Sequence, residues 1–209
     1  MLDFSTIKQI TIPEGTVKKI EINNDIVWRR ELPEGYTRLD YISFNNNKCF
    51  DLQFIPDLNT KIICTFKRST TGSFYLYGVT NSNNTKSVTA YLSSTGNWRF
   101  GNKYKGIASI STNTKYHSIQ DKTNLIVEDV LEYTYSSQNY FKCLGNLFLG
   151  GNNTNGAGTP GSAKLKGIVY EFQIYQDDVF ACNLIPSKDP NNVEGFYDNI
   201  RDLFLTSII

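Results

Sequence analysis

The sequence predicts an all-β protein, an antiparallel two-sheet sandwich or jelly roll, preceded by a small three-stranded β module. Three observations support this. Aromatic residues are plentiful, with 13 Tyr and 13 Phe beside one Met and one His. Short runs of alternating apolar and polar residues recur along the chain, and Asn- and Gly-rich clusters separate them. No segment keeps a 3.6-residue period, so we expect strands joined by turns rather than helices.

The first 30 residues resemble a separate module. Residues 6–12 and 16–22 alternate in polarity, and the Pro-Glu-Gly between them is typical of a tight turn. Residues 26–30 follow a second turn as a third short strand. A unit this small needs packing on something else for stability. We therefore expect residues 1–30 to dock or oligomerise, and residues 31–209 to form the main domain.

The main domain reads as a succession of short strands. A second Pro-Glu-Gly, at residues 33–35, introduces the first one. It repeats the turn chemistry of the module rather than a whole repeated unit. The predicted strands cover residues 36–44, 48–55, 60–68, 73–80, 87–93, 98–104, 115–122, 124–135, 146–151, 165–176, 179–186 and 193–205.

Charge and cysteine usage exclude several classes of partner. The chain has 21 Lys and Arg against 20 Asp and Glu, so nothing favours nucleic acid or an anionic membrane. No apolar run approaches the roughly 20 residues that span a bilayer, and the start lacks the pattern of a secretory signal peptide. Cys49, Cys64, Cys143 and Cys182 lie far apart in apolar runs. We expect buried free thiols there, not a zinc site.

Several motifs then match a known family in order. The stretch "LPEGYTRLDYISFNNNKCFDLQFIPDLNTKI" resembles the opening of a concanavalin A-like (laminin-G-like) jelly-roll domain common in phage and prophage proteins. "WRFGNKYKG", "LFLGGNNTNGAGTPGSAKLKGIVYEFQIYQDD" and "NLIPSKDPNNVEGFYD" are similar to later landmarks. The match runs from Leu32 to about Leu205, and departs from the family at Leu52-Gln53 and at Ser187. The positions that match the family's opening are Tyr36, Leu39, Tyr41, Ile42, Phe50, Asp51 and Pro56.

Catalytic patterns are weak. A glucanase of this fold needs carboxylates on one face of a strand. Glu128 and Glu132 share a face, but Asp129 points the other way, so the pattern fails. The family resemblance implies a turn after a strand here, so we expect a hairpin tip at residues 128–129. His117 is the only histidine and has no nucleophile elbow nearby. We expect no enzyme, no cofactor and no metal, although loop Asp and Asn oxygens leave calcium as an alternative.

Glycan binding is the chemistry that the composition favours. Sugar sites combine aromatic rings for stacking with Asn, Asp or Arg for hydrogen bonds. For Trp98, core packing is the first interpretation, because an aromatic-rich β domain fills its core with such rings, and ligand contact is the second. The long Asn- and Gly-rich loop at residues 151–163 is a second source of polar contacts. The candidate ligand residues are Trp98, Arg99, Tyr91, Tyr104, Asn152, Asn153 and Asn155.

The resemblance implies a phage or prophage virion component, such as a capsid decoration, head fibre or tail appendage, assembled in the bacterial cytoplasm. Residues 1–30 would contact other virion proteins, and the jelly roll would face outward and bind host-surface or mucosal glycans. A homo-oligomer is expected by analogy. The alternatives are a structural cap without a ligand and a glycoside hydrolase.

Overall fold

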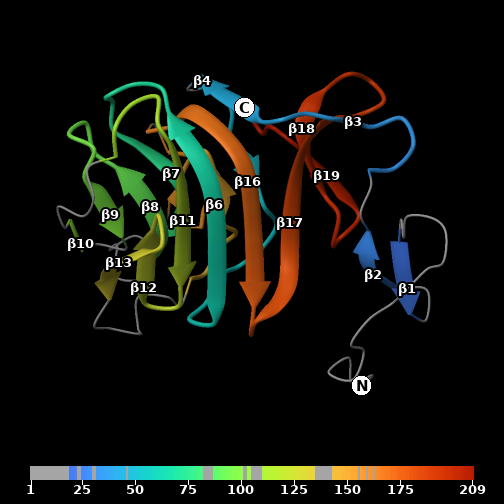
Figure 1. Ribbon diagram of the computed structural model, residues 1–209, viewed down its shortest axis with the longest axis horizontal. Coiled ribbons are helices and arrows are strands. Elements are labelled where there is room, and N and C mark those ends of the chain that lie inside the picture. Colours follow the sequence, from blue (N-terminus) through green and yellow to red (C-terminus); the bar gives the residue numbers. More distant parts are fainter. Residues whose placement is uncertain are drawn as a thin grey trace.

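The computed structural model describes residues 19–22, 25–29, 32–45, 47–81, 87–100, 103–104, 110–134, 143–154, 156–158, 160–161 and 163–209. For 19–22, 25–29, 99–100, 103–104 and 131–133 it describes the backbone alone. Every regular element in these ranges is a strand (Figure 1). This confirms the predicted all-β jelly-roll sandwich of two sheets.

The larger sheet holds ten of the described strands. Its main path is antiparallel, and two short strands, β3 and β4, join it from the side. Strands β11, β6, β16 and β17 run side by side through the middle of Figure 1. In order the path is β13 (Val130–Thr134), β12 (Asn124–Val127), β11 (Lys115–Asp121), β6 (Thr60–Arg68), β16 (Lys166–Gln176), β17 (Val179–Lys188), β18 (Glu194–Asp198) and β19 (Leu203–Thr206), with β3 (Thr37–Arg38) on β17 and β4 (Ile42–Asn45) on β16.

The smaller sheet holds seven described strands. All its pairings are antiparallel except that of β15 (Asn153–Thr154), which runs parallel to β7. The order of the others is β10 (Lys103–Tyr104), β9 (Trp98–Phe100), β8 (Ser87–Leu92), β7 (Phe74–Thr80), β14 (Phe148–Leu149) and β5 (Phe50–Asp51).

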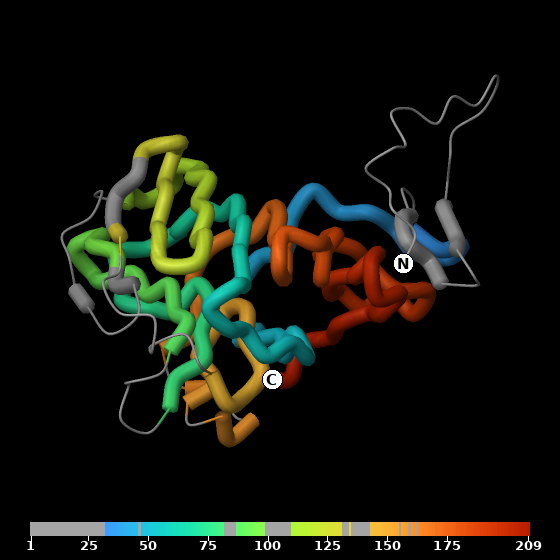
Figure 2. The backbone as a smooth tube through the Cα atoms, turned by 90° about the horizontal axis from the view of Figure 1, so that it is seen from below, coloured from blue at the N-terminus to red at the C-terminus, as the bar shows by residue number. Residues whose placement is uncertain are grey.

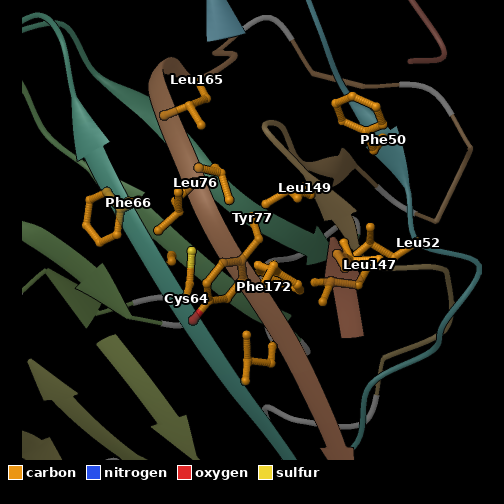
Figure 3. Close-up of a cluster of buried hydrophobic side chains, with 14 of the residues drawn as sticks. Phe50, Leu52, Cys64, Phe66, Leu76, Tyr77, Leu147, Leu149, Leu165 and Phe172 are labelled. Atoms are coloured by element: carbon orange, nitrogen blue, oxygen red, sulfur yellow. The ribbon is translucent and has the colours of Figure 1, made fainter. Parts of the chain in front are cut away.

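The core fills the space between the sheets, because each central strand turns alternate residues inward. Ile62, Cys64 and Phe66 of β6 are fully buried there. Figure 3 shows Phe172 of β16 beside Tyr77 of β7, with ring centroids 5.6 Å apart. The alternation leaves the odd-numbered residues of β6 on the outer face of the larger sheet.

Segments far apart in the sequence are joined within the larger sheet. Residues 32–45, blue in Figure 2, run beside the red C-terminal strands. Tyr36 packs against Tyr197 and Phe204, with ring centroids 5.2 and 5.4 Å away. These contacts fix the start of the sandwich on its last two strands.

Four predicted strands are each divided in the structure, which is a correction; the one over 124–135 is the hairpin β12–β13, and the one over 193–205 is the pair β18–β19. The strand predicted over 36–44 breaks into β3 and β4, because β3 pairs with β17 and β4 with β16. The strand predicted over 98–104 is the hairpin β9–β10, with Tyr104 opposite Arg99. Alternation of side chains cannot reveal a break that depends on the partner strand.

The hairpin tip predicted at residues 128–129 is confirmed. Glu128 and Asp129 join β12 to β13, and both have positive φ, 49° and 63°. Two consecutive left-handed residues are characteristic of a type I′ hairpin turn, which suits the twist of the flanking strands.

Of the predicted N-terminal module, the structure describes an antiparallel hairpin of β1 (Lys19–Ile22) and β2 (Asp25–Arg29). The strand predicted over 6–12 lies outside the described residues. The division of the chain at residue 30 and the docking role of residues 1–30 stay predictions.

All four cysteines are free, and Cys49, Cys64 and Cys182 are buried, which confirms the prediction of free thiols. Within the described residues, no helix is long and apolar enough to cross a membrane.

Candidate functional site

The outer face of the larger sheet carries a fork between two neighbouring strands. One side of β16 pairs with β17 over residues 172–176 and with β4 over residues 166–169. Beyond Leu184, β17 turns away from β16 and pairs with β3 on that same side. Residues 37–45 therefore occupy the space that opens between the two strands.

A β-bulge lies at this fork. In the pairing of β16 with β6, Val169 faces Phe66 and Glu171 faces Thr65, so Tyr170 is the extra residue. Val169 and Phe172 both point into the core. The bulge therefore places Tyr170 and Glu171 together on the outer face, a rearrangement that bulges often make beside functional sites.

A groove of about 650 Å³ opens at the fork. This volume is within the range of about 300–1,000 Å³ that is usual for small-molecule sites. Tyr170 supplies an aromatic surface in the groove. Its ring lies 5.8 Å from the Tyr41 ring, and the Lys115 ammonium lies 4.5 Å from its centroid. The ring is thus braced by its neighbours.

A row of polar side chains crosses three strands next to the groove. His117 of β11, Thr65 of β6 and Glu171 of β16 are direct cross-strand neighbours. The Thr65 hydroxyl donates to Glu171 Oε2 at 3.2 Å and lies 3.1 Å from His117 Nδ1. Gln173 Nε2 donates to Glu171 Oε1 at 2.7 Å. Both carboxylate oxygens of Glu171 therefore accept hydrogen bonds from neutral side chains.

The opposite wall comes from β17, from the turn after β18, and from β3 with the segment that follows it. Asn183 lines it, and its side-chain amide donates to Asn199 Oδ1 at 2.8 Å. The backbone amide of Asn183 donates to the buried carboxylate of Asp198 at 3.1 Å. Arg38 and Asp40 complete this wall. The groove thus offers guanidinium, amide, carboxylate and phenol groups on rigid strands.

His117 lies in β11, within the strand predicted over 115–122, and shares the outer face with Thr65. Its backbone amide donates to the carboxylate of Glu128, and Glu128 returns a backbone hydrogen bond of 3.0 Å to the His117 carbonyl. Glu128 therefore holds the β12–β13 turn against β11. The described residues contain no group of three or more His, Cys, Asp or Glu side chains that would hold a metal ion.

Trp98 lies in the core, which agrees with its core-packing interpretation and does not support a ligand role. Its side chain is 0% exposed and packs edge-on against Phe66, with centroids 5.6 Å apart. The ligand role predicted for Asn152 and Asn153 needs correction, because they are 4% and 1% exposed. Asn152 Nδ2 donates to Thr80 Oγ1 at 3.0 Å, and Asn153 Nδ2 donates to the Asn146 carbonyl at 2.9 Å. These amides hold their loop in place.

The other predicted ligand residues are untested. Tyr91 is half-buried on β8, and its ring lies 4.8 Å from that of Tyr75. The strand register places Tyr91 opposite Arg99 and Arg99 opposite Tyr104. The side chains of Arg99 and Tyr104, and all of Asn155, lie outside the described part of the chain. This row on the smaller sheet remains a prediction.

The residues of the groove were missed by the sequence reasoning. The stretch "VYEFQIYQ" of β16 did carry a signal, since Glu171, Gln173 and Tyr175 alternate with the core residues Phe172 and Ile174. Polar residues on the solvent side of a strand are ordinary, however. Only the fork and the bulge distinguish them from any other solvated face.

No protein-family model matches this chain, and no curated protein matches it. Among solved structures, it is similar to CBM40 of the Ruminococcus gnavus IT-sialidase bound to α2,3-sialyllactose, at 15% identity and a TM-score of 0.49, over 68% of this chain and 92% of that one. It is also similar to a heptameric SAP-like pentraxin from Limulus polyphemus, at 15% identity and a TM-score of 0.46, over 67% of this chain and 75% of that one. A third similar structure is that of mouse laminin α1 domains LG4-5, at 13% identity and a TM-score of 0.44, over 89% of this chain and 52% of that one.

Proposed function

We propose that this protein is a non-enzymatic glycan-binding domain and that the groove at the fork between β16 and β17 is its site. The observation that carries the proposal is the lining of the groove. Planar polar side chains surround a braced Tyr170 ring. Sugars are bound by this combination, since hydroxyls pair with amide, guanidinium and carboxylate groups while a C–H face packs on a ring.

Binding rather than turnover is the proposed activity of the groove, although it holds two carboxylates, Glu171 and Asp40. Glycoside hydrolysis needs one carboxyl group as proton donor and a second as base or nucleophile. Glu171 already accepts hydrogen bonds at both oxygens, from Thr65 and Gln173. Its role is to hold neighbouring side chains in place and to accept from a ligand hydroxyl.

The biological setting rests on the sequence resemblance. The motifs between Leu32 and Leu205 that resemble phage and prophage jelly rolls support a virion surface component. In that setting residues 1–30 attach the chain to other virion proteins, and the jelly roll presents the groove to host-surface or mucosal glycans. Particles assembled with a chain that lacks residues 1–30 test this; retention of the truncated chain on the particle contradicts the docking role.

Glycan binding is tested by a glycan array followed by calorimetry on the glycans that bind. Tyr170→Ala and Asn183→Ala alter the groove, whereas Tyr91→Ala alters the row on the smaller sheet and is the matched control. We expect the two groove variants to lose affinity by about tenfold or more, equivalent to about 1.4 kcal/mol each. Loss confined to Tyr91→Ala would move the site to the smaller sheet.

Failure to bind any glycan would leave the structural cap as the better reading. Hydrolysis of a bound glycan, abolished by Glu171→Gln, would contradict the non-enzymatic part of the proposal. Glu128→Gln is the control for that assay, because Glu128 lies at a hairpin tip.

A further inference from the structure

Two lysines face each other at the rim of the groove. Lys67 of β6 and Lys115 of β11 are directly opposite in the antiparallel register. Phe66 and Tyr116 beside them pack toward the core, so both lysines project from the outer face. Like charges in this arrangement lie about 5 Å apart at Cβ and destabilise a sheet. A sheet keeps such a pair at a cost to its stability.

Neither lysine is neutralised within the described part of the chain. The ion pairs found there join Lys48 to Glu194, Lys61 to Asp121 and Arg201 to Asp198. Lys61 stands on the same face of β6 as Lys67 and does have its counter-ion, at 3.9 Å. At one end of this face of β6 a lysine therefore has its counter-ion, whereas Lys67 and Lys115 form no ion pair with a described residue.

One lysine of the pair, Lys115, lines the groove, and Lys67 stands beside it on β6. The Lys115 ammonium lies 4.5 Å from the Tyr170 ring centroid. Arg38, on the opposite wall, also forms no ion pair with a described residue. The groove has two carboxylates, and that of Glu171 already accepts hydrogen bonds from Thr65 and Gln173. Lys67, Lys115 and Arg38 thus set three cations in and beside the groove against its two carboxylates, Glu171 and Asp40.

From this geometry we infer that the ligand is an acidic glycan. A sugar ring lies along Tyr170, and a carboxylate, sulfate or phosphate substituent is bound by Lys67 and Lys115. This inference rests on the proposed glycan-binding function. The anion supplies the negative charge that the lysine pair lacks, and the interaction is local because the chain as a whole carries a net charge of only +1.

The test compares acidic and neutral polysaccharides on the full chain. Calorimetry with polygalacturonate and a heparin oligosaccharide is set against dextran and a maltodextrin. Lys67→Gln/Lys115→Gln is compared with Lys122→Gln, an exposed lysine in the β11–β12 turn. We expect at least one acidic glycan to bind and the double variant to weaken it by about tenfold or more, with a shallower salt dependence. Lys122→Gln leaves the affinity within about twofold.

A second variant separates binding from structure. Lys67→Glu places a carboxylate opposite Lys115 and removes the like-charge pair. We expect its urea midpoint to rise while its affinity for the acidic glycan falls by more than that of Lys67→Gln. A rise in midpoint with unchanged affinity would overturn the inference, because the lysines would then have no part in binding.

The outcomes also distinguish this inference from the proposed function. Equal affinity for neutral and acidic glycans, lost in Tyr170→Ala but not in the lysine variants, overturns the acidic ligand and keeps the glycan site. Absence of binding to every polysaccharide overturns both. Tight binding of a single-stranded oligonucleotide in place of the acidic glycans would make the rim a nucleic-acid contact and contradict the inference.

Discussion

The Thr65 hydroxyl donates its hydrogen bond to Glu171 Oε2, 3.2 Å away on the adjacent strand. A hydroxyl has a single proton. The 3.1 Å contact between Thr65 Oγ1 and His117 Nδ1 must therefore take its proton from the histidine. The hydrogen-bond network assigns His117 the tautomer protonated at Nδ1. One threonine thus connects the histidine of β11 to the carboxylate of β16.

Thr65→Val keeps the shape of this side chain and removes the bridge. Glu171 and His117 are partly exposed, so water replaces the lost partner in part. We expect a loss of about 0.5–1.5 kcal/mol in the free energy of unfolding, measured in urea. Nitrogen NMR of the only histidine should show loss of the Nδ1-protonated preference. Thr65→Ser is the control, and it should retain both properties.

A substitution of Trp98 tests whether this side chain belongs to the core or contacts a ligand. Trp98→Phe should lower the free energy of unfolding by about 1–3 kcal/mol, since the smaller ring leaves a cavity against Phe66. Glycan affinity of the folded variant should stay within about twofold of the parent. A selective loss of affinity without loss of stability would restore Trp98 as a ligand contact.

Gly150 is expected to be intolerant of alanine for two separable reasons. Its φ is +82°, and a Cβ would come within 2.3 Å of the Phe44 ring. Gly158 has a φ of +73° with nothing within 4 Å of its would-be Cβ. Gly158→Ala should cost about 1–2 kcal/mol of stability from the backbone alone. Gly150→Ala should cost clearly more; equal costs in urea unfolding would argue against the close contact.

Because the Cys49 thiol is buried, we expect the free energy of unfolding to fall at alkaline pH. Burial raises the pKa of this thiol from 9.0 to about 12. Above pH 9 the unfolded thiol loses its proton while the folded one keeps it, so the unfolded state binds fewer protons and stability falls as pH rises. The loss from this group is about 1.4 kcal/mol at pH 10 and grows until about pH 12.

Cys49→Ala is the matching measurement. Urea unfolding at pH 7.5 and pH 10 should show a smaller decrease in the variant than in the parent, by about 1.4 kcal/mol. Parallel decreases in the two proteins would contradict the raised pKa. The other buried thiols are unchanged between the two proteins, so their contribution cancels.

Much of the sandwich was predictable because strand alternation is local. The predicted strand over residues 60–68 is β6 with the same bounds. The tip at Glu128 and Asp129 was expected from the family resemblance. The broken strand over 36–44 did not, because its break depends on two partners, β16 and β17, that come more than 120 residues later. A single sequence does not state which strands will be neighbours.

The candidate site shows the same division between what local sequence determines and what depends on distant segments. By itself the sequence determined the fold class, the free thiols, the β6 strand and a polar outer face along "YEFQIYQ". Only the tertiary structure decided that Trp98 is core and that Tyr170 and Glu171 share one face. The groove also depends on the tertiary structure. It forms where β16 and β17 separate and residues 37–45 run between them as part of its wall. Strand periodicity acts between neighbours in the chain, whereas a fork, a bulge and a row of cross-strand partners depend on register between distant segments.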